Sequence, residues 1–465
     1  MSSYFVWPNK LQTLQDLRSG NLKGIRHLKL SCGLTRFPCE ILTLADTLEI
    51  LDLSGNALSE LPPEFSQLSK LKIIFCSDNA FTELPEVLGN CHELSMIGFK
   101  ANRINKLTAK AIPPKLRWLI LTNNAIKQLP DEIGNCTQLQ KLMLAGNQLT
   151  ELPISLSNCK NLELLRIAAN QFETLPIWLF TLPRLSWLAF SGNPFTRNFE
   201  ENALNNSPID TISWHDLECG HLIGEGASGH IYQVIHIHSE QKLPLAVKLF
   251  KGSLTSDGFP ESEMASSIAA GKHPNLINVF GKIDNHPDSK AGLVMELVDP
   301  SFVTLASPPS LESCTRDIYN ANCSFNLDRI LCIAYGVASA VRHIHAQGIM
   351  HGDLYAHNIL LDEQDKVLIG DFGASSFYPV ADKALDSKLE RLEARAFGCL
   401  LEELLDLSSI NPEHQQAIDL LGNLKINCLS EKIENRPLFD EICKLLERLI
   451  HITMRAKSHT ISLTL

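Results

Sequence analysis

The sequence predicts an α/β solenoid followed by a second domain of α+β type. Three observations carry this prediction. The chain has 465 residues, which exceeds the roughly 250–300 residues at which a single hydrophobic core stops growing. Units of 22 or 23 residues repeat between positions 25 and 195, and such a fixed period is typical of a solenoid. The repeat pattern then stops, and strand-like and helix-like stretches without a period follow.

The repeat units follow the pattern LxxLxLxxNxLxxLPxxIxxLxxL, which is clearest at residues 139–161. This pattern resembles the leucine-rich repeat. In such a unit the LxL stretch forms a short strand whose leucines point into a shared core, and the asparagine satisfies buried amides at the turn. We predict eight units over residues 25–195, preceded by an N-terminal cap at residues 1–24. The first unit has Gly33 in place of the asparagine. The other units supply the ladder Asn56, Asn79, Asn102, Asn124, Asn147, Asn170 and Asn193.

The concave side of the repeats carries unexpected apolar residues. Side chains alternate along a strand, so the residue between the two strand leucines faces the concave solvent side. An apolar floor on that side is typical of a binding surface for a protein partner or substrate. The alternative is a face covered by the second domain of the same chain. The candidate partner-binding residues are Phe75, Trp118, Ile120, Met143 and Trp187.

Composition and charge limit the remaining possibilities. The 41 Lys+Arg and 52 Asp+Glu residues give a net charge of −11 without a basic stripe, so we expect no nucleic-acid partner. No window reaches the 18 apolar residues of a membrane span, and the sequence MSSYFVWPNK lacks the pattern of a signal peptide. We therefore expect a soluble, cytoplasmic protein. The thirteen cysteines are odd in number and form no CxxC, which favours reduced thiols. The shared repeat position of Cys91, Cys136 and Cys159 predicts small buried hydrophobes.

A glycine-rich turn opens the second half, after a polar stretch at residues 196–213 that we interpret as a linker. Gly224, Gly226 and Gly229 have GxGxxG spacing, which lets a backbone pass close to phosphates without Cβ clashes. A dinucleotide-binding turn would continue into a helix. Here the strand-like stretches HIYQVIHIH and LPLAVKLF follow. The pattern therefore predicts a flap of two strands.

Further motifs follow in a fixed order. LPLAVKLF contains Lys248, and Glu263 follows fifteen residues later in a helix-compatible stretch opened by Pro260. LVMELV at 293–298, HGDLYAHN at 351–358, LIGDFG at 368–373 and an ENRP ending at Pro437 come next. Together they resemble the protein kinase family over residues 214–450, with a C-terminal tail at residues 451–465. The whole chain resembles a cytoplasmic leucine-rich repeat protein kinase. The expected fold class is an α/β leucine-rich repeat solenoid followed by a two-lobed α+β protein kinase-like domain.

The resemblance implies ATP and Mg²⁺ as cofactors and assigns roles to the matched residues. Lys248 would contact the ATP phosphates and be held by an ion pair with Glu263. Asp371 and Asn358 would bind Mg²⁺, and Asp353 would accept or orient the proton of the substrate hydroxyl. The further residues implied in ATP binding are Gly224, Gly226 and Gly229 at the phosphates, Ile231, Ala246 and Leu360 around adenine, Met295 at the back of the pocket, and Glu296 and Val298 in the hinge.

The catalytic loop departs from the family in two places. Gly352 replaces the arginine that clamps a phosphorylated activation loop, so activation should not need loop phosphorylation. Tyr355 replaces the lysine that serine/threonine kinases place at the γ-phosphate, and His357 could substitute for that lysine when protonated. The loss of positive charge predicts slower chemistry and leaves the acceptor specificity open.

The segment after Asp371 is shorter than in the family, and no Ala-Pro-Glu motif occurs. The stretch EARAFG resembles the family's DxWxxG helix start, with Glu393 in place of the aspartate. A platform for peptide substrates must therefore be reduced or differently built. Arg436 normally pairs with the missing glutamate, so we expect it to pair with Glu390 or Glu393 instead, because an unpaired buried guanidinium is costly.

These motifs favour an ATP-dependent protein kinase, a phosphotransferase to an alcohol group of serine/threonine type, whose repeats recruit the substrate or partner. An ATP-binding pseudokinase scaffold that acts through its repeats is one alternative. A small-molecule phosphotransferase is another, because an open site without a platform could accept a compact alcohol. A metal site is not expected at His343, His345, His351 and His357, since their spacing fits no usual zinc site.

Overall fold

The computed structural model describes residues 12–206, 209–226, 228–237, 244–252, 254–379, 383–409 and 414–463. The first eleven residues of the expected N-terminal cap and the last two of the expected tail lie outside these ranges. The described chain divides into two compact units. One unit contains the residues up to Leu185 together with Asn193–Phe195. The other contains Ser186–Gly192 and the chain from Thr196 onward.

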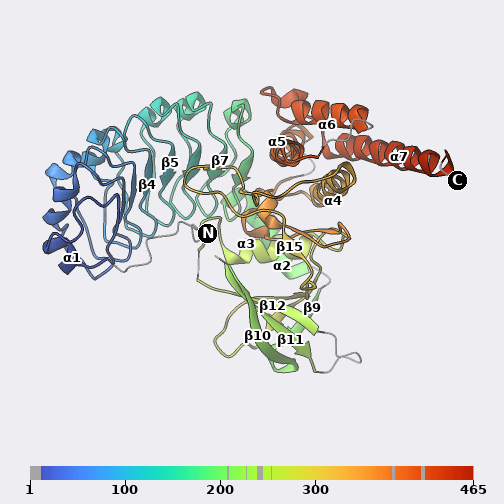
Figure 1. Ribbon diagram of the computed structural model, residues 1–465. Coiled ribbons are helices and arrows are strands. Elements are labelled where there is room, and N and C mark those ends of the chain that lie inside the picture. Colours follow the sequence, from blue (N-terminus) through green and yellow to red (C-terminus); the bar gives the residue numbers. More distant parts are fainter. Residues whose placement is uncertain are drawn as a thin grey trace. The chain divides into compact units, whose positions relative to one another are not determined.

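The repeats form one sheet of eight parallel strands in sequence order (Figure 1). The strand register aligns the central residue of each strand with the central residue of the next, as in the pairs Leu28 with Leu51 and Leu119 with Leu142. All of these central side chains are fully buried, which confirms the expected core. The strands are β1 (His27–Lys29), β2 (Ile50–Asp52), β3 (Ile73–Phe75), β4 (Met96–Gly98), β5 (Trp118–Ile120), β6 (Lys141–Met143), β7 (Leu164–Arg166) and β8 (Trp187–Ala189).

Short helices complete the repeats, and most of them are preceded by the proline of the repeat pattern. After α1 (Leu14–Arg18), these helices are of the 3₁₀ type, because a unit of about 23 residues leaves only one or two helical turns. They are η1 (Cys39–Leu44), η2 (Pro63–Gln67), η3 (Glu86–Asn90), η4 (Ala109–Ala111), η5 (Asp131–Asn135), η6 (Ile154–Asn158) and η7 (Ile177–Thr181).

The asparagine ladder works as the sequence predicted. Asn147, for example, donates from Nδ2 to the carbonyls of Leu121 and Leu144 and accepts from the amide of Ile126. Buried backbone groups at the turns are thereby satisfied. All thirteen cysteines are free thiols, and burial raises the pKa of Cys159 to about 12. Cys91 and Cys136 are buried as well, which confirms their interpretation as small core residues.

The apolar concave floor is only partly exposed. Phe75, Trp118 and Ile120 are half-buried. Met143 is only 7% exposed, because the strand register places it between Ile120 and Arg166. Trp187 is 2% exposed. Met143 and Trp187 therefore do not form an open surface, and the expectation that they face solvent was wrong.

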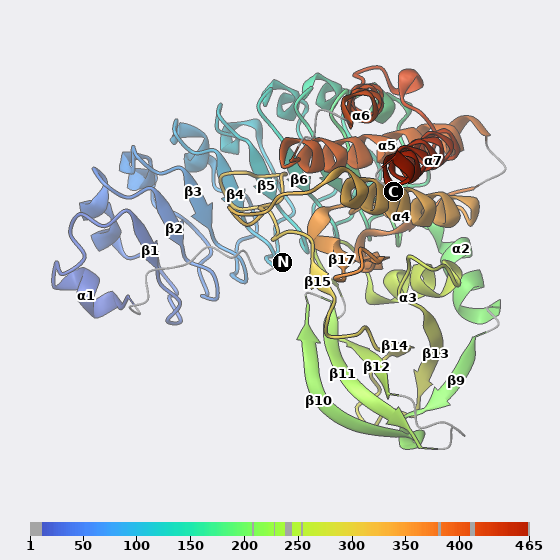
Figure 2. The ribbon, with the colours of Figure 1, turned by 45° about the vertical axis from the view of Figure 1, so that its right-hand side comes forward.

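The second unit contains a six-stranded sheet in the order β10-β11-β12-β14-β13-β9. The glycine-rich turn joins β10 (Leu217–Glu225) and β11 (Gly229–His236), followed by β12 (Pro244–Phe250), β13 (Val279–Asp284) and β14 (Gly292–Glu296). The neighbouring strands are antiparallel except for β9, which is parallel to β13. Val234, Val247 and Val294 form part of the core of this sheet. Helix α3 (Pro260–Ala269) lies beside the sheet (Figure 2).

The polar segment at residues 196–213 is not an irregular linker. It contains most of helix α2 (Pro194–Asn206) and strand β9 (Asp210–Ser213). Leu204 and Ile209 pack against the cluster of Phe250, Ile268 and Leu293. The polar composition hid these few apolar anchors, which make the segment an extension of the sheet. Residues 207–208 lie outside the described ranges.

Four helices form most of the second lobe of this unit (Figure 2). They are α4 (Leu327–Ala346), α5 (Lys383–Asp406), α6 (Gln415–Cys428) and α7 (Phe439–Leu463). Helix α4 packs on α7, and α5 packs on α6. Residues 451–463, expected as a separate tail, continue α7, whose alternation of apolar and polar residues extends past position 450. No helix among the described residues is long and apolar enough to cross a membrane.

Short strands and turns carry the polar motifs between α4 and α5. One sheet contains β15 (Val303–Thr304), β17 (Ile359–Leu361) and β18 (Val367–Ile369), and a second pairs β16 (Ile349–Met350) with β19 (Ser376–Phe377). The 3₁₀ helices η9 (Ala356–Asn358) and η10 (Phe372–Ala374) lie in the loops, and η8 (Trp214–Asp216) and η12 (Ile433–Asn435) lie outside this region.

Candidate active site

The glycine-rich turn connects β10 and β11 with little side-chain bulk. The amide of Gly226 donates to the carbonyl of Gly229 at 2.9 Å, and Gly224 pairs with Ile231 across the two strands. A Cβ at Gly229 would lie 2.5 Å from the carbonyl oxygen of Leu249, so only glycine fits beside β12. A Cβ at Gly226 would meet nothing within 4 Å. β10 and β11 thus form a pair of strands that flanks the glycine-rich turn, as the sequence predicted.

A buried ion pair joins β12 to α3. Lys248 Nζ contacts Glu263 Oε1, and the Glu263 side chain is 4% exposed. Burial disfavours the ammonium, but the charges of Glu263 and Asp371 outweigh it and raise the pKa of Lys248. The lysine is therefore a fixed cation. Pro260 starts α3 at its first turn, where its missing N–H costs nothing, and thereby fixes the register of Glu263.

The catalytic loop follows β16 and holds Asp353 in a buried position. Asn358 donates from Nδ2 to the Asp353 backbone carbonyl and to its carboxylate Oδ2, both at 2.9 Å. The amide of Asp353 donates to His351 Nδ1 at 3.3 Å, so the other ring nitrogen of His351 donates to the carbonyl of Gly370. The orientation of the Asp353 carboxylate is thus fixed by side chains of its own loop.

Asp371 follows β18 in a left-handed conformation, with φ of 56°. Its Oδ1 accepts the amide of Gly373 at 3.2 Å, and the residue is exposed. Phe372 is buried against the ring of His351, at a centroid distance of 5.4 Å. A Cβ at Gly373 would lie 3.1 Å from Asp371 Oδ1 and 3.7 Å from Glu263 Oε2, so this turn lies next to the ion pair. The structure thus brings Lys248, Glu263 and Asp371 together, as expected.

Three of the residues expected around adenine, Ile231, Ala246 and Met295, lie on neighbouring strands of the six-stranded sheet. Ala246 pairs with Met295 between β12 and β14 and is 3% exposed. Ile231 lies on β11, and Leu360 lies on β17 of the second lobe. The amide of Glu296 donates to the carbonyl of Asn278, and its carboxylate accepts from the Asn278 side chain. The Glu296 N–H is therefore already bonded, and Val298 follows in the irregular segment after β14.

Gly352 and Tyr355, the two residues of the catalytic loop that depart from the family, are both closely packed. Gly352 has φ of 73°, and a Cβ there would lie 2.5 Å from the Ala374 carbonyl oxygen and 2.7 Å from that of Leu188. Tyr355 is buried, and its ring stacks on that of Trp187 with a centroid distance of 4.2 Å and an interplanar angle of 8°. Trp187 is therefore buried because it contacts the catalytic loop.

His357 is held by Asp317, which sequence reasoning did not single out. The Nδ1 of His357 lies 2.7 Å from Asp317 Oδ1, and its amide donates to Asp317 Oδ2 at 3.0 Å. Burial disfavours the imidazolium, but these bonds to Asp317, with the charges of Asp353 and Asp371, raise the pKa of His357. Asp317 lies in an irregular segment without a motif, so no signal in the sequence marks it.

Glu393 on α5 binds the backbone of the catalytic loop. Its carboxylate accepts the amides of His351 at 3.1 Å and Gly352 at 2.7 Å, and it lies 2.7 Å from His345 Nε2. Burial disfavours the imidazolium, but the neighbouring carboxylates of Glu390 and Glu393 raise the pKa of His345 to about 9. The hydrogen bond and charge of the same histidine, together with the amide of Gly352, lower the pKa of Glu393 against the effect of burial.

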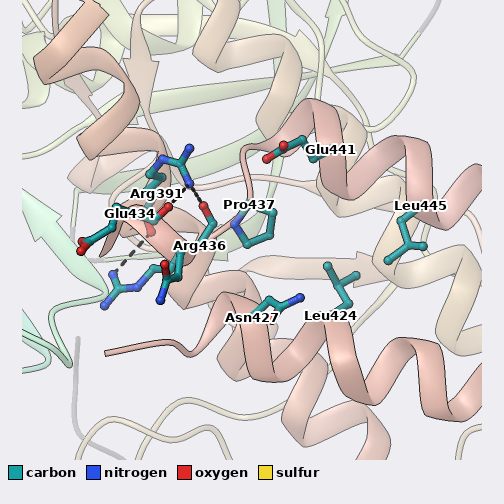
Figure 3. A pocket seen from close by; sticks show the side chains of 9 residues that line it. Arg391, Leu424, Asn427, Glu434, Arg436, Pro437, Glu441 and Leu445 are labelled. Atoms are coloured by element: carbon teal, nitrogen blue, oxygen red, sulfur yellow. Dashed lines mark hydrogen bonds between the residues drawn. The ribbon is translucent and has the colours of Figure 1, made fainter. Parts of the chain in front are cut away.

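Arg436 is buried beside a pocket between α5, α6 and α7 (Figure 3). Its Nε donates to the carbonyl of Ser430 at 2.8 Å and its Nη1 to that of Arg391 at 3.4 Å, and burial lowers its pKa to about 10. The expected carboxylates lie elsewhere, since Glu393 binds the catalytic loop and Glu390 lies 3.7 Å from His345 Nδ1. Arg436 thus binds these two backbone carbonyls and neither of the two expected glutamates. The pocket lining includes Arg391, Leu424, Asn427, Glu434, Pro437, Glu441 and Leu445.

Oxygen donors suitable for Mg²⁺ are present at the expected positions. Asp371 offers an exposed carboxylate, and Asn358 uses its amide nitrogen for Asp353, so its amide oxygen is the atom left for a cation. Within the described ranges, no group of three or more His, Cys, Asp and Glu side chains could hold a metal by itself. This sparse set fits Mg²⁺, which is commonly held by one or two protein groups together with substrate phosphates.

Comparison with protein families agrees with the geometry. Residues 217–390 match the family model of the protein kinase domain. Residues 47–68, 114–172 and 137–195 match leucine-rich repeat models. The chain therefore contains leucine-rich repeats followed by a protein kinase domain.

Individual relatives are distant and longer. Fibroblast growth factor receptor 1 of Pleurodeles waltl is 25% identical over 313 residues, covering 56% of this chain and 38% of the relative. Serine/threonine-protein kinase PITSLRE of Drosophila melanogaster is 26% identical, covering 49% of this chain and 22% of the relative. Dual specificity testis-specific protein kinase 1 of Mus musculus is 23% identical, covering 53% and 44%. The chain thus spans less than half the length of each of these relatives.

Proposed function

We propose that this protein is an ATP- and Mg²⁺-dependent protein kinase that phosphorylates serine or threonine, and that its repeats recruit the substrate or partner. The observation that carries the proposal is the buried ion pair of Lys248 and Glu263 next to Asp371. Burying two charges is costly and seldom stabilises a fold by itself. Such a pair beside a glycine-rich flap therefore favours a site that binds phosphate.

The residues of the site divide the work of phosphoryl transfer. Lys248 would neutralise the phosphates, while Asp353, held by Asn358, would accept the proton of the attacking hydroxyl. Asp371 and Asn358 would hold Mg²⁺, which spreads the charge of the phosphates when it is bound. When protonated, His357 would supply the cation lost at Tyr355, and the charges of Asp317, Asp353 and Asp371 favour this form by raising its pKa. A serine/threonine acceptor draws support from the relative named serine/threonine-protein kinase PITSLRE.

A phosphorylation assay with γ-labelled ATP, Mg²⁺ and a casein acceptor tests this proposal. We expect Asp371→Ala in the full chain to lower phosphate incorporation about 100-fold or more. Asp288→Ala is the matched control, because Asp288 is an exposed aspartate of the same unit. Acid hydrolysis of the product should yield phosphoserine or phosphothreonine. Equal incorporation by the two variants would refute the proposal, and phosphotyrosine alone would refute the acceptor type.

Two observations keep other functions in view. Tyr355 is stacked and buried where a kinase places a cation, which favours a pseudokinase scaffold. That function predicts a shift in melting temperature with ATP but no turnover on any protein, including the chain itself.

Helix α5 begins only six positions after Phe377, which leaves little chain for a peptide platform. This brevity favours a compact alcohol as acceptor, and labelled ATP with a panel of small alcohols tests it.

The repeats offer Phe75, Trp118 and Ile120 to a protein partner. These three side chains are half-buried. The ring of Phe75 lies against Gly98, where a Cβ would lie 2.5 Å from it, so the glycine leaves room for this ring. Phe75→Asp with Ile120→Asp should weaken binding of the protein substrate and raise its KM, while the KM for ATP stays unchanged. An unchanged KM for the protein substrate would remove the repeats from recruitment.

A further inference from the structure

The segment Ser186–Gly192, which continues directly from the repeats, belongs to the same compact unit as the kinase residues. Trp187 stacks flat on Tyr355, two positions after Asp353. Its indole Nε1 also donates to the carbonyl of Leu354 at 3.1 Å. One side chain therefore fixes both a ring and a backbone group of the catalytic loop.

The same segment binds the chain that follows Asp371. The amide of Phe190 donates to Ser376 Oγ at 2.9 Å. Arg395 on α5 donates to Ser186 Oγ at 3.1 Å. These side chains are buried, so the bonds are shielded from water. The carbonyl of Leu188 lies so close to Gly352 that a side chain at that position would collide with it. The segment therefore leaves no room for the arginine that the family has at position 352.

A second contact runs to the helix that holds the ion pair. Glu200 on α2 is 9% exposed. Its Oε1 accepts the amide of Gly192 at 2.8 Å, and its Oε2 accepts the hydroxyl of Ser262 at 2.7 Å. Ser262 directly precedes Glu263 on α3. The end of the segment is therefore connected through one carboxylate to the residue next to the glutamate of the ion pair.

We propose that Trp187 and Glu200 are positioning residues of the kinase site, acting as an internal clamp. Trp187 holds the catalytic loop at Leu354 and Tyr355, and Glu200 holds the first turn of α3 at Ser262. This inference rests on the proposed kinase function and adds to it a regulatory consequence. These contacts keep the catalytic loop and the first turn of α3 in place. Phosphorylation of the segment after Asp371 is therefore not needed to order them.

The physical argument is preorganisation. Transfer requires the base and the phosphate-binding cation to be in place together, and a misplacement of about 1 Å can cost about 100-fold in rate. The entropy cost of ordering the groups that Trp187 and Glu200 contact is met during folding, before ATP or substrate binds. A loop tied in this way loses the freedom to be switched by an added phosphate. Gly352, without the arginine that would read such a phosphate, agrees with this arrangement.

Hydrogen exchange and kinetics on the full chain test the clamp. For Trp187→Ala we expect faster amide exchange at residues 352–358 and a kcat lowered about tenfold to 100-fold, with the KM for ATP within about twofold. Trp187→Phe retains the stacked ring and should restore most of both. Trp178→Ala is the control, because Trp178 lies on η7 in the unit of the repeats.

Glu200 provides an independent variant. Glu200→Ala removes both bonds and should speed exchange at the first turn of α3 and lower kcat. Glu200→Gln should restore both, because its amide oxygen can accept from Gly192 and its NH₂ can donate to Ser262. Glu201→Ala is the matched control on the exposed side of α2.

The two levels of the inference fail in different ways. Unchanged exchange at residues 352–358 in Trp187→Ala, or at the first turn of α3 in Glu200→Ala, would overturn the clamp. A loss of kcat that follows the loss of melting temperature in all variants, without rescue by Trp187→Phe or Glu200→Gln, would also overturn it. If the wild-type chain transfers no phosphate, the proposed function fails, and the exchange measurements still decide whether the clamp exists.

Discussion

The repeats and the catalytic loop both bury backbone polar groups, but they satisfy them over very different sequence distances. In the repeats, Asn79, Asn147 and Asn170 each bond to a carbonyl 26 positions earlier. In the catalytic loop, the amide of Gly352 bonds to Glu393, 41 positions away, and the carbonyl of Leu354 bonds to Trp187, 167 positions away. In the repeats, seven equivalent asparagines each satisfy the backbone groups of one turn. In the catalytic loop, single residues such as Glu393 and Trp187 do this, and no equivalent residue can replace them.

This difference predicts where a single substitution is most harmful. A change in the ladder removes one of many equivalent supports. A change at the loop removes a support on which several groups converge. The expectations below follow that contrast, starting with the largest effect.

Glu393→Ala should be the most destabilising change. It leaves the amides of His351 and Gly352 and the imidazole of His345 without their shared carboxylate in a fully buried site. Removing one partner of a buried charge pair costs about 3–5 kcal/mol. Urea unfolding of the second unit, followed by tryptophan fluorescence, measures this loss. Glu390→Ala is the control, since Glu390 is 19% exposed and lies 3.7 Å from His345, and it should cost clearly less. A cost below about 1 kcal/mol for Glu393→Ala would contradict the anchoring role.

Gly352→Ala should be the next largest effect, and Gly33→Ala provides a matched comparison in the repeats. The two glycines have nearly the same φ, 73° and 72°. A Cβ at Gly33 would meet nothing within 4 Å, whereas at Gly352 it would collide with the carbonyls of Leu188 and Ala374. The left-handed backbone costs about 1–2 kcal/mol in either variant, and overpacking adds about 1–3 kcal/mol at Gly352 alone. Thermal unfolding of both variants gives the difference, and equal costs would rule out the steric role of Leu188.

The stability of the region around the catalytic loop should depend on pH through His345. The pKa of His345 is raised to about 9 in the folded chain, above its usual value of 6.5. Its protonation therefore stabilises the fold fully below about pH 6.5, and this contribution is lost as the pH rises through about 9. The change is on the order of 3 kcal/mol. The charged groups facing this ring are Glu390 and Glu393. Unfolding free energies between pH 6 and 9.5 measure the change, and His345→Gln should flatten it. A slope that persists in His345→Gln would assign the effect to another group.

The sequence predicted the repeats almost completely because their contacts are periodic. One unit, once understood, describes the strands, the core and the asparagines of all the others. The motifs of the second half likewise predicted Lys248, Glu263, Asp353, Asn358 and Asp371 in one site. The structure pairs Lys248 with Glu263 next to Asp371 and bonds Asn358 to Asp353. Their roles toward ATP and Mg²⁺ remain proposals.

What the sequence could not show are contacts that no period and no motif records. Trp118 and Trp187 occupy the same position of their repeats, yet Trp118 lies 4.4 Å from the ammonium of Lys141 and Trp187 stacks on Tyr355. The pattern alone makes the two tryptophans equivalent. Asp317 and Glu200 lie in stretches of ordinary polar composition, where a buried carboxylate has no sequence signal. The segment 196–213 was misjudged for the same reason, since its few apolar anchors are diluted by polar residues.

The smallest expected effect belongs to the ladder. Asn147→Ala removes the bonds to Leu121, Leu144 and Ile126 and leaves those backbone groups buried, which costs about 1–3 kcal/mol. Asn161→Ala is the matched control, because Asn161 is only half-buried and its side chain makes a solvent-exposed bond to the carbonyl of Thr137. Hydrogen exchange should show that the Asn147 variant loosens its own and the adjoining units, while residues 352–358 exchange as in the wild type. If those loop amides also exchanged faster, the ladder and the loop would be coupled, and the contrast between distributed and concentrated support would fail.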